Sequence, residues 1–372
     1  ARQQTVFANY IYQSIFGQNE NQQYSAGLTF NYDRFDESFN DFLVASLQKT
    51  KTVDFLRKER TIGAFFQYTG AFWEKLTVMA GIRYDYHNLF GGFFTPRLHL
   101  AYAPDDFTML KFSAGHGSRT ANILADNSYL LASAASIYVN GELLAEHPEE
   151  LDRLDMEKAW NFGVQLNRKF LLFDRILNIN LDYYRTNFTN QVVVDNETTA
   201  DQVNFHNLAG DSYSNCYQVE GKYELIPRFD VTGAFRYNDV KSTIGGELKR
   251  AALQSKYKGL VNLSYYTNMK KWQFDFTTQF NGPGRIPLNP AIPQEQQHDS
   301  FDSFRVMNAQ VTKFFRRWSI YAGCENIGDF TQKHPILNAD SPWSAGFDSS
   351  RIWGPVHGRK FYLGLRFGLD RN

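Results

Sequence analysis

Apolar and polar residues alternate strictly in many segments of this chain. In segment 359–367, Phe361, Leu363, Leu365 and Phe367 alternate with polar, small or amphipathic residues. A period of two is typical of a β-strand whose two faces meet different surroundings. Similar segments begin near residues 24, 76, 177 and 272, and the whole chain contains about fifteen of them. Most are close to the roughly 9–11 residues with which a tilted strand crosses a bilayer.

The links between these segments alternate in length. The short links are GQNEN, WEK, PDD, KFLLF, IPR, NMKK and FRR. The longer links between them include 35–58, 118–154, 188–212, 283–302 and 328–357, with 88–94 as a short exception. A soluble sandwich has no reason to keep its long loops on one side, whereas outer-membrane barrels have short periplasmic turns and long extracellular loops. The pattern therefore predicts an all-β protein, an antiparallel transmembrane β-barrel.

Charged residues on the polar phase of the strands support a water-filled interior. They are Arg83, Asp85, Arg97, Lys111, Lys222, Glu224 and Arg236. A sandwich core would have to pair each of these charges, whereas the lumen of a barrel would not. We take Arg83 and Asp85 as candidates for contacting a ligand in the lumen.

Composition narrows the class of protein further. Aromatic residues make up 16% of the chain, which suits a barrel with aromatic rings at both membrane interfaces. The mean hydropathy is −0.45 and no run of about 20 apolar residues occurs, which excludes a helical membrane protein. The formal net charge is zero, so no basic field indicates a nucleic-acid partner.

Residue types that carry chemistry are present but not in catalytic or metal-binding patterns. The GHGS stretch at 115–118 lacks the strand–turn–helix context of a nucleophile, and the eight histidines are scattered without ligand spacing. We expect no enzyme activity, no metal site and no cofactor. The strand phase places Cys216 toward the lumen and Cys324 on the opposite face, so we expect no disulfide between them.

Four motifs in order resemble TonB-dependent outer-membrane receptors. They are TPRLHLAYAPDDFTMLKFSAGHGSRTANI, HPEELDRLDMEKAWNFGVQL, CENIGDF and GRKFYLGLRF. The matching positions are Pro96, Arg97, Gly115, Gly117, Arg119, Pro148, Glu149, Glu157, Asn161, Gly163, Asn326, Gly358 and Arg359. The resemblance extends from about residue 95 to 367, most of the chain.

The resemblance implies a 22-stranded barrel with a plug in its lumen. Residues 1–372 would then be one part of the barrel domain, with the plug, the TonB-contacting segment and about seven strands preceding Ala1. It also implies energised uptake of a scarce nutrient chelate, a ferric siderophore or cobalamin, across the bacterial outer membrane. The implied partners are outer-membrane lipid, the TonB complex and the small chelate, and a surface lipoprotein is left open. The alternative is a passive porin-like channel.

The last long loop supplies most of the candidate ligand contacts. It contains Trp343, Phe347, Arg351 and Trp353, and Arg119 lies at the rim of an earlier loop. The aromatic side chains of this loop would either stack on a bound ligand or pack one loop against another. The sequence leaves both roles open.

Overall fold

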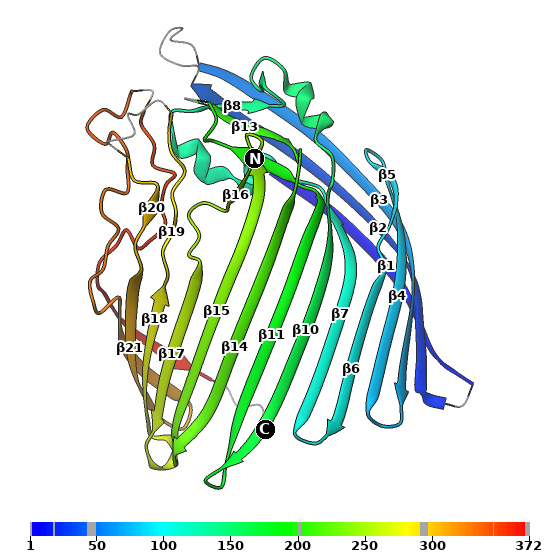
Figure 1. Ribbon diagram of the computed structural model, residues 1–372, viewed down its shortest axis with the longest axis vertical. Coiled ribbons are helices and arrows are strands. Elements are labelled where there is room, and N and C mark those ends of the chain that lie inside the picture. Colours follow the sequence, from blue (N-terminus) through cyan, green and yellow to red (C-terminus); the bar gives the residue numbers. More distant parts are fainter. Residues whose placement is uncertain are drawn as a thin grey trace.

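The computed structural model of the protein describes residues 2–17, 19–42, 50–199, 202–290, 297–344 and 346–368. Their dominant feature is one large, strongly curved antiparallel sheet, with two small sheets at the end where the long loops gather (Figure 1). Among the described residues, no helix is long and apolar enough to cross a bilayer.

The large sheet contains seventeen segments. They are β1 (Arg2–Phe16), β2 (Asn19–Phe42), β3 (Thr50–Phe72), β4 (Leu76–His87), β5 (Gly91–Phe94), β6 (Arg97–Asp105), β7 (Thr108–Arg119), β10 (Glu157–Leu172), β11 (Arg175–Asn190), β14 (Ser212–Ile226), β15 (Phe229–Ile244), β16 (Glu247–Arg250), β17 (Tyr257–Tyr266), β18 (Trp272–Asn281), β21 (Phe304–Phe314), β22 (Trp318–Glu325) and β23 (Lys360–Phe367).

These segments make fifteen strands in an up-and-down meander. β5 and β6 both pair with β4, and β16 and β17 both pair with β15, so each of these couples is one interrupted strand. Every strand pairs antiparallel with its predecessor and its successor in the chain. The expectation of an antiparallel barrel wall of about fifteen strands is therefore confirmed, and such a wall leaves a polar inner face and an apolar outer face.

Short links join the strands at one end of the wall, as the sequence predicts. The link expected at KFLLF is wrong in its position, because Lys169 to Leu172 stay paired with β11. Phe173 and Asp174 alone connect β10 to β11, and both have positive φ, 47° and 58°. Two consecutive residues with positive φ form the tight hairpin turn whose twist matches that of its flanking strands.

The expected long loop at 35–58 is wrong. β2 and β3 stay paired from Asp36 opposite Leu56 to Phe42 opposite Thr50. The polar stretch that suggests a loop is held in the sheet because its inner face is covered. Phe55, for example, packs against the apolar cluster of a later loop.

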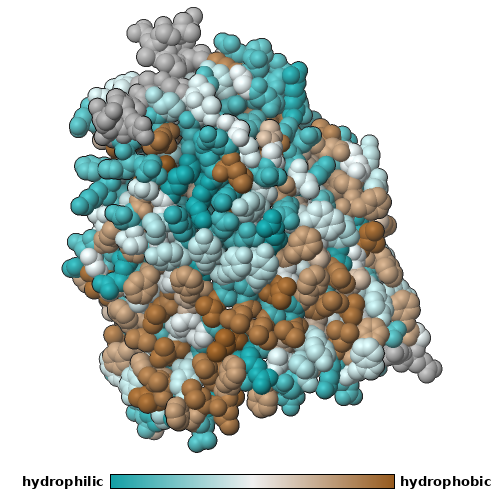
Figure 2. All heavy atoms as spheres, in the orientation of Figure 1, coloured by the Kyte–Doolittle hydropathy of each residue, from teal (hydrophilic) through white to brown (hydrophobic). Residues whose placement is uncertain are grey.

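The outer face of the wall has an apolar band between two aromatic rings. Tyr237 lies opposite Tyr257, and eight residues away Phe229 lies opposite Tyr265. Tyr24, opposite Tyr68, is likewise eight residues from Tyr32. Eight residues of tilted strand rise by roughly 20 Å, close to the height of the apolar band of an outer-membrane barrel, about 25 Å. We call Tyr32, Tyr237 and Tyr257 the loop-side ring. Figure 2 shows apolar residues gathered across the lower half of the visible face and hydrophilic ones above them.

Two long loops form a small folded unit beyond this ring. Its sheet contains β8 (Ser136–Val139), β9 (Glu142–Leu143), β12 (Val192–Asp195) and β13 (Gln202–Asn207). Its helical turns are α1 (Ile123–Asp126), η1 (Ser128–Ala132) and η2 (Pro148–Arg153). A further helical turn, η3 (Asn268–Lys270), lies outside this unit, in the short link between β17 and β18. Its apolar core is Ile123, Leu130, Ile137, Val139, Leu144, Leu154, Val192, Val203 and Phe205. The remaining small sheet pairs β19 (Gly284–Arg285) with β20 (Ser300–Phe301).

The two cysteines lie on opposite faces of the wall. Cys216 shares the phase of Gln218, which bonds the lumen-facing Arg236, whereas Cys324 lies opposite the outward Phe361. Both thiols are free.

Candidate functional site

The lumen wall carries an ion pair between two of the predicted site residues. Arg83 and Asp85 both lie on β4 and face inward, with Arg83 Nη2 2.5 Å from Asp85 Oδ1 and Nε 2.6 Å from Oδ2. Arg83 Nη2 also donates to Thr29 Oγ1 at 2.6 Å. The charge of Arg83 is therefore matched within the wall, and its side chain is held in one position.

Gly63 makes room for this pair. It lies opposite Asp85 on β3, and a Cβ atom added there would overlap the Asp85 carboxylate and crowd the Arg83 guanidinium. The absence of a side chain at this position therefore allows two charged groups to lie flat against the strand.

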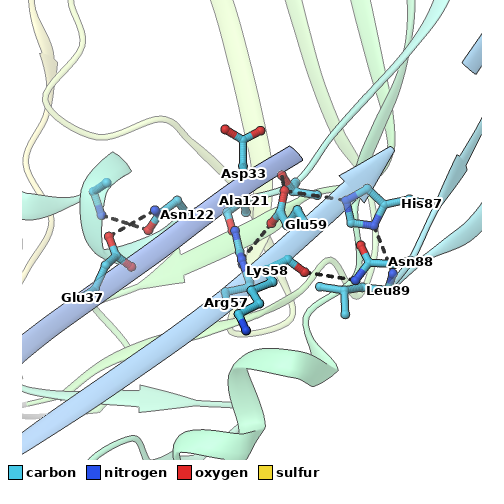
Figure 3. Close-up of polar contacts among 12 residues, drawn as sticks. Asp33, Glu37, Arg57, Lys58, Glu59, His87, Asn88, Leu89, Ala121 and Asn122 are labelled. Atoms are coloured by element: carbon cyan, nitrogen blue, oxygen red, sulfur yellow. Dashed lines mark hydrogen bonds and ion pairs between the residues drawn. The ribbon is translucent and has the colours of Figure 1, made fainter. Parts of the chain in front are cut away.

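A second polar cluster lies one position beyond the loop-side ring. Glu59 Oε1 lies 2.7 Å from Arg57 Nε, and Glu59 Oε2 accepts from Thr120 Oγ1 at 3.0 Å and lies 3.6 Å from His87 Nε2 (Figure 3). Arg57 also donates to the carbonyl oxygen of Ala121 at 3.1 Å. The start of the 120–156 loop is thereby fastened to β3 and β4.

The chemistry of Glu59 follows from these contacts. Burial raises the pKa of Glu59, but the hydrogen bond to His87, the charge of Arg57 and the hydrogen bond from Thr120 together outweigh burial. The pKa of Glu59 therefore lies below its ordinary value of 4.5. Figure 3 also shows Asn122, which donates to Glu37 at 3.2 Å and fastens the same loop to β2.

The long loops are cross-linked to one another. Arg285 donates to both carboxylate oxygens of Glu197, at 2.5 and 2.8 Å. The backbone N–H of Ala134 donates to the carbonyl oxygen of Phe347 at 3.0 Å. These contacts connect four loops that are far apart in the sequence. The loops therefore hold one another in place through contacts within the chain.

A pocket of about 610 Å³ opens between the loop after β18 and the loop after β22. Its aromatic lining residues are Phe301, Phe330 and Trp353. The rings of Phe301 and Trp353 are parallel, with 4.5 Å between their centroids, and Phe330 stacks at 4.8 Å on Phe304, which lies outside the lining. Its cationic and potentially cationic groups are Lys333, His298, His334 and Arg351. The pocket combines an apolar surface with a few polar groups, as small-molecule sites do.

The charges around this pocket are not equally available. Arg351 is buried, with Nε 2.7 Å from Asp348 Oδ2, so its charge is already matched. Lys333, His298 and His334 are exposed and form no ion pair with the described part of the chain. Among the described lining residues, Lys333 is therefore the cation that remains open to an anionic ligand, and the exposed carboxylate of Asp302 lines the same pocket.

Comparison with known proteins places the chain in a family. Residues 2–327 match the family model described as TonB dependent receptor-like, beta-barrel. The chain belongs to this family. No curated protein sequence is significantly similar to it.

Two solved siderophore receptors and a copper transporter share the fold of this chain at low sequence identity. A variant of the ferric enterobactin receptor PfeA from Pseudomonas aeruginosa, in complex with enterobactin, matches with a TM-score of 0.68 and 13% identity, over 98% of this chain and 54% of that one. The siderophore receptor PirA from Acinetobacter baumannii matches with a TM-score of 0.68 and 14% identity, over 98% of this chain and 55% of that one. The copper transporter OprC matches with a TM-score of 0.68 and 14% identity, over 98% of this chain and 57% of that one. The chain thus spans about half the length of these solved structures.

Membership of the TonB-dependent receptor family shows in which membrane the barrel wall lies. The family lies in the bacterial outer membrane and consists of transport receptors rather than enzymes. The predicted lumen-facing and lipid-facing phases of the strands therefore face the transport path and the bilayer, respectively. Among the described residues, no group of three or more His, Cys, Asp or Glu side chains could hold a metal ion.

The structure brings only some of the predicted site residues together. Arg351 and Trp353 line the pocket, Phe347 lines a smaller neighbouring cavity with Arg351, and the Trp343 side chain is 91% exposed. Arg83 and Asp85 lie apart from them in the wall. Arg119 lies at the rim, where it bonds Glu157 at 2.6 Å and Asp126 at 3.2 Å.

No sequence pattern indicates the remaining residues of the pocket. His298, Phe301, Lys333 and His334 come from two loops and show no spacing that would mark a site. Only the observation that both loops are long and lie on the same side of the barrel pointed toward them.

Proposed function

We propose that residues 1–372 are part of the barrel of a receptor that imports a scarce nutrient chelate, with energy delivered by the TonB complex. Membership of the family and the likeness to about half of each solved receptor support this proposal. A plug, a TonB-contacting segment and about seven further strands would precede Ala1. The membrane lipid, the TonB complex and the chelate are its partners.

The pocket at the loop end is the feature that supports the proposed class of ligand. Its volume of about 610 Å³ lies within the range of small-molecule sites, roughly 300–1,000 Å³. The parallel Phe301–Trp353 stack offers an apolar surface, Lys333 offers positive charge, and His298 and His334 offer ring nitrogens for hydrogen bonds. A ferric siderophore, which combines planar groups with negative charge, fits this lining best, and cobalamin is the second candidate.

The predicted contact residues lie at two levels of the barrel. Trp343, Phe347, Arg351 and Trp353 belong to the mouth, with Arg119 at its rim. Arg83 and Asp85 lie lower, in the lumen wall, where their matched charges would offer hydrogen bonds to a passing ligand without holding it by net charge.

Uptake by the full-length receptor tests this proposal. Cells that lack their own receptors would be given iron-loaded enterobactin or cobalamin, with and without TonB. Saturable uptake of one probe that disappears without TonB is expected. A liposome-swelling assay tests the passive channel, and steady flux of small solutes through full-length protein would overturn the energised receptor.

A further inference from the structure

We propose that the outer face of the barrel wall binds the phosphate groups of anionic membrane lipids. The binding groups form a cationic collar at the loop-side ring and just beyond it. We define the collar as Arg34, Lys58, Arg60, Arg185, Lys241 and Arg250. This proposal concerns the lipid-facing side of the wall and does not depend on which nutrient the receptor carries.

The first part of the collar lies on β2 and β3. Arg34 is directly opposite Lys58, and Arg60 is directly opposite Tyr32, with its guanidinium 5.8 Å from the Tyr32 ring centroid. The phase of these strands turns all three cations outward, because the residues between them, such as Glu59, face the covered interior.

The charges of this group are poorly matched. Arg34 lies 3.5 Å from Asp36, but neither Lys58 nor Arg60 forms an ion pair with the described residues. Like charges directly opposite each other on one face of a sheet repel and destabilise the pair. An anion that contacts both Arg34 and Lys58 would remove that cost.

The second part of the collar repeats this arrangement on another part of the wall, on β11, β15 and β16 (Figure 1). Lys241 is directly opposite Arg250. Arg250 lies 3.0 Å from Asp239, whereas Lys241 forms no ion pair within the described structure. Arg185 lies nearby on β11, with its guanidinium 5.1 Å from the ring centroid of Tyr213, which is opposite Lys241.

The height of the collar identifies the partner. Arg34 follows Tyr32 by two residues, and Lys241 follows Tyr237 by four, so both lie slightly beyond the aromatic ring on the outward phase. Aromatic rings mark the level of lipid headgroups. Guanidinium and ammonium groups bind phosphate through charge-assisted hydrogen bonds. A nutrient in the lumen cannot reach these side chains, so the occupant that fits is a phosphate-bearing lipid headgroup.

The test measures lipid retention by the full-length receptor. Protein purified in detergent would be loaded with phosphatidylglycerol or with zwitterionic phosphatidylcholine, and bound lipid counted by native mass spectrometry. One variant carries Arg34→Gln with Lys58→Gln, and another carries Lys241→Gln with Arg250→Gln. The matched control carries Lys111→Gln with Lys222→Gln, which removes the same charge from the lumen face.

We expect each collar variant to lower retention of phosphatidylglycerol about tenfold, since a cation near an anionic surface contributes roughly a few-fold in affinity. The lumen control should retain as much as the unmodified protein. The charge-conserving pair Arg34→Lys with Lys58→Arg should restore retention, and the gel shift between boiled and unboiled samples confirms folding of every variant.

Three results would overturn the proposal. The first is equal retention of anionic and zwitterionic lipid by the unmodified protein. The second is unchanged retention in both collar variants, which would leave an acidic surface protein as the occupant to examine. The third is displacement of the lipid by an equal concentration of inorganic phosphate, which would indicate a site for free anions.

Discussion

Arg285 and Glu197 lie 88 residues apart in the chain, yet the guanidinium donates two hydrogen bonds to the carboxylate. The two side chains are only 22% and 8% exposed. The pair connects the loop after β18, which forms the pocket, to the loop after β11, which belongs to the small folded unit. The shape of the mouth therefore depends on a contact between the loop that forms the pocket and a loop that does not line it.

Arg285→Gln should loosen this connection. Removing one partner of a buried ion pair costs about 3 kcal/mol, because the other charge stays buried without a partner. Amide exchange in β12 and β13 should quicken by roughly a hundredfold. Arg119→Gln is the matched control, since Arg119 is 63% exposed and its pair with Glu157 should contribute about 1 kcal/mol or less. Equal effects of the two variants would contradict the structural role given to Arg285.

Trp343 and Trp353 should respond differently to replacement by alanine. Trp353 stacks on Phe301, so Trp353→Ala should destabilise the pocket by about 3 kcal/mol and quicken exchange in β20. Trp343 is 91% exposed, so Trp343→Ala should leave exchange unchanged while weakening binding of the nutrient about tenfold. Unchanged binding in the Trp343 variant would remove that residue from the site.

Gly63→Ala should destabilise the barrel wall. The added Cβ atom would overlap the Asp85 carboxylate and force apart the Arg83–Asp85 pair, which we expect to cost about 2 kcal/mol. The temperature at which the protein changes its gel mobility should fall. Gly233→Ala is the control, because a Cβ atom there meets nothing within 4 Å. If both variants shift this temperature alike, the cost belongs to glycine replacement in general.

The fastening of the 120–156 loop should weaken in acid. The pKa of Glu59 is lowered in the folded state, so its contribution to stability is fully present above the ordinary value of 4.5 and is lost as the pH falls through the lowered value. Proteolysis of this loop should therefore accelerate as the pH falls below 4.5 and through the lowered pKa of Glu59. Glu59→Gln should be cleaved readily already at neutral pH, with a flatter pH dependence. A loop that resists proteolysis equally at pH 3 and pH 7 would refute the role of Glu59.

The alternation of residues alone determined the wall. Fifteen strands, their inward and outward phases and the short turns follow from a period of two and from local turn chemistry, which each segment carries within itself. The opposite faces of Cys216 and Cys324 follow in the same way. Such features need no knowledge of distant residues.

The tertiary structure decided what lies beyond the loop-side ring. The sequence predicts a loop at the polar ends of β2 and β3, but these ends stay paired because a later loop covers their inner face. The sequence makes Arg351 a candidate ligand contact, but the structure buries its side chain and pairs its charge with Asp348. The pocket at the mouth and the Arg285–Glu197 pair join segments from different loops. A periodic pattern records which way a side chain points, but contacts between loops depend on the path of the chain in space, and no local pattern encodes that path.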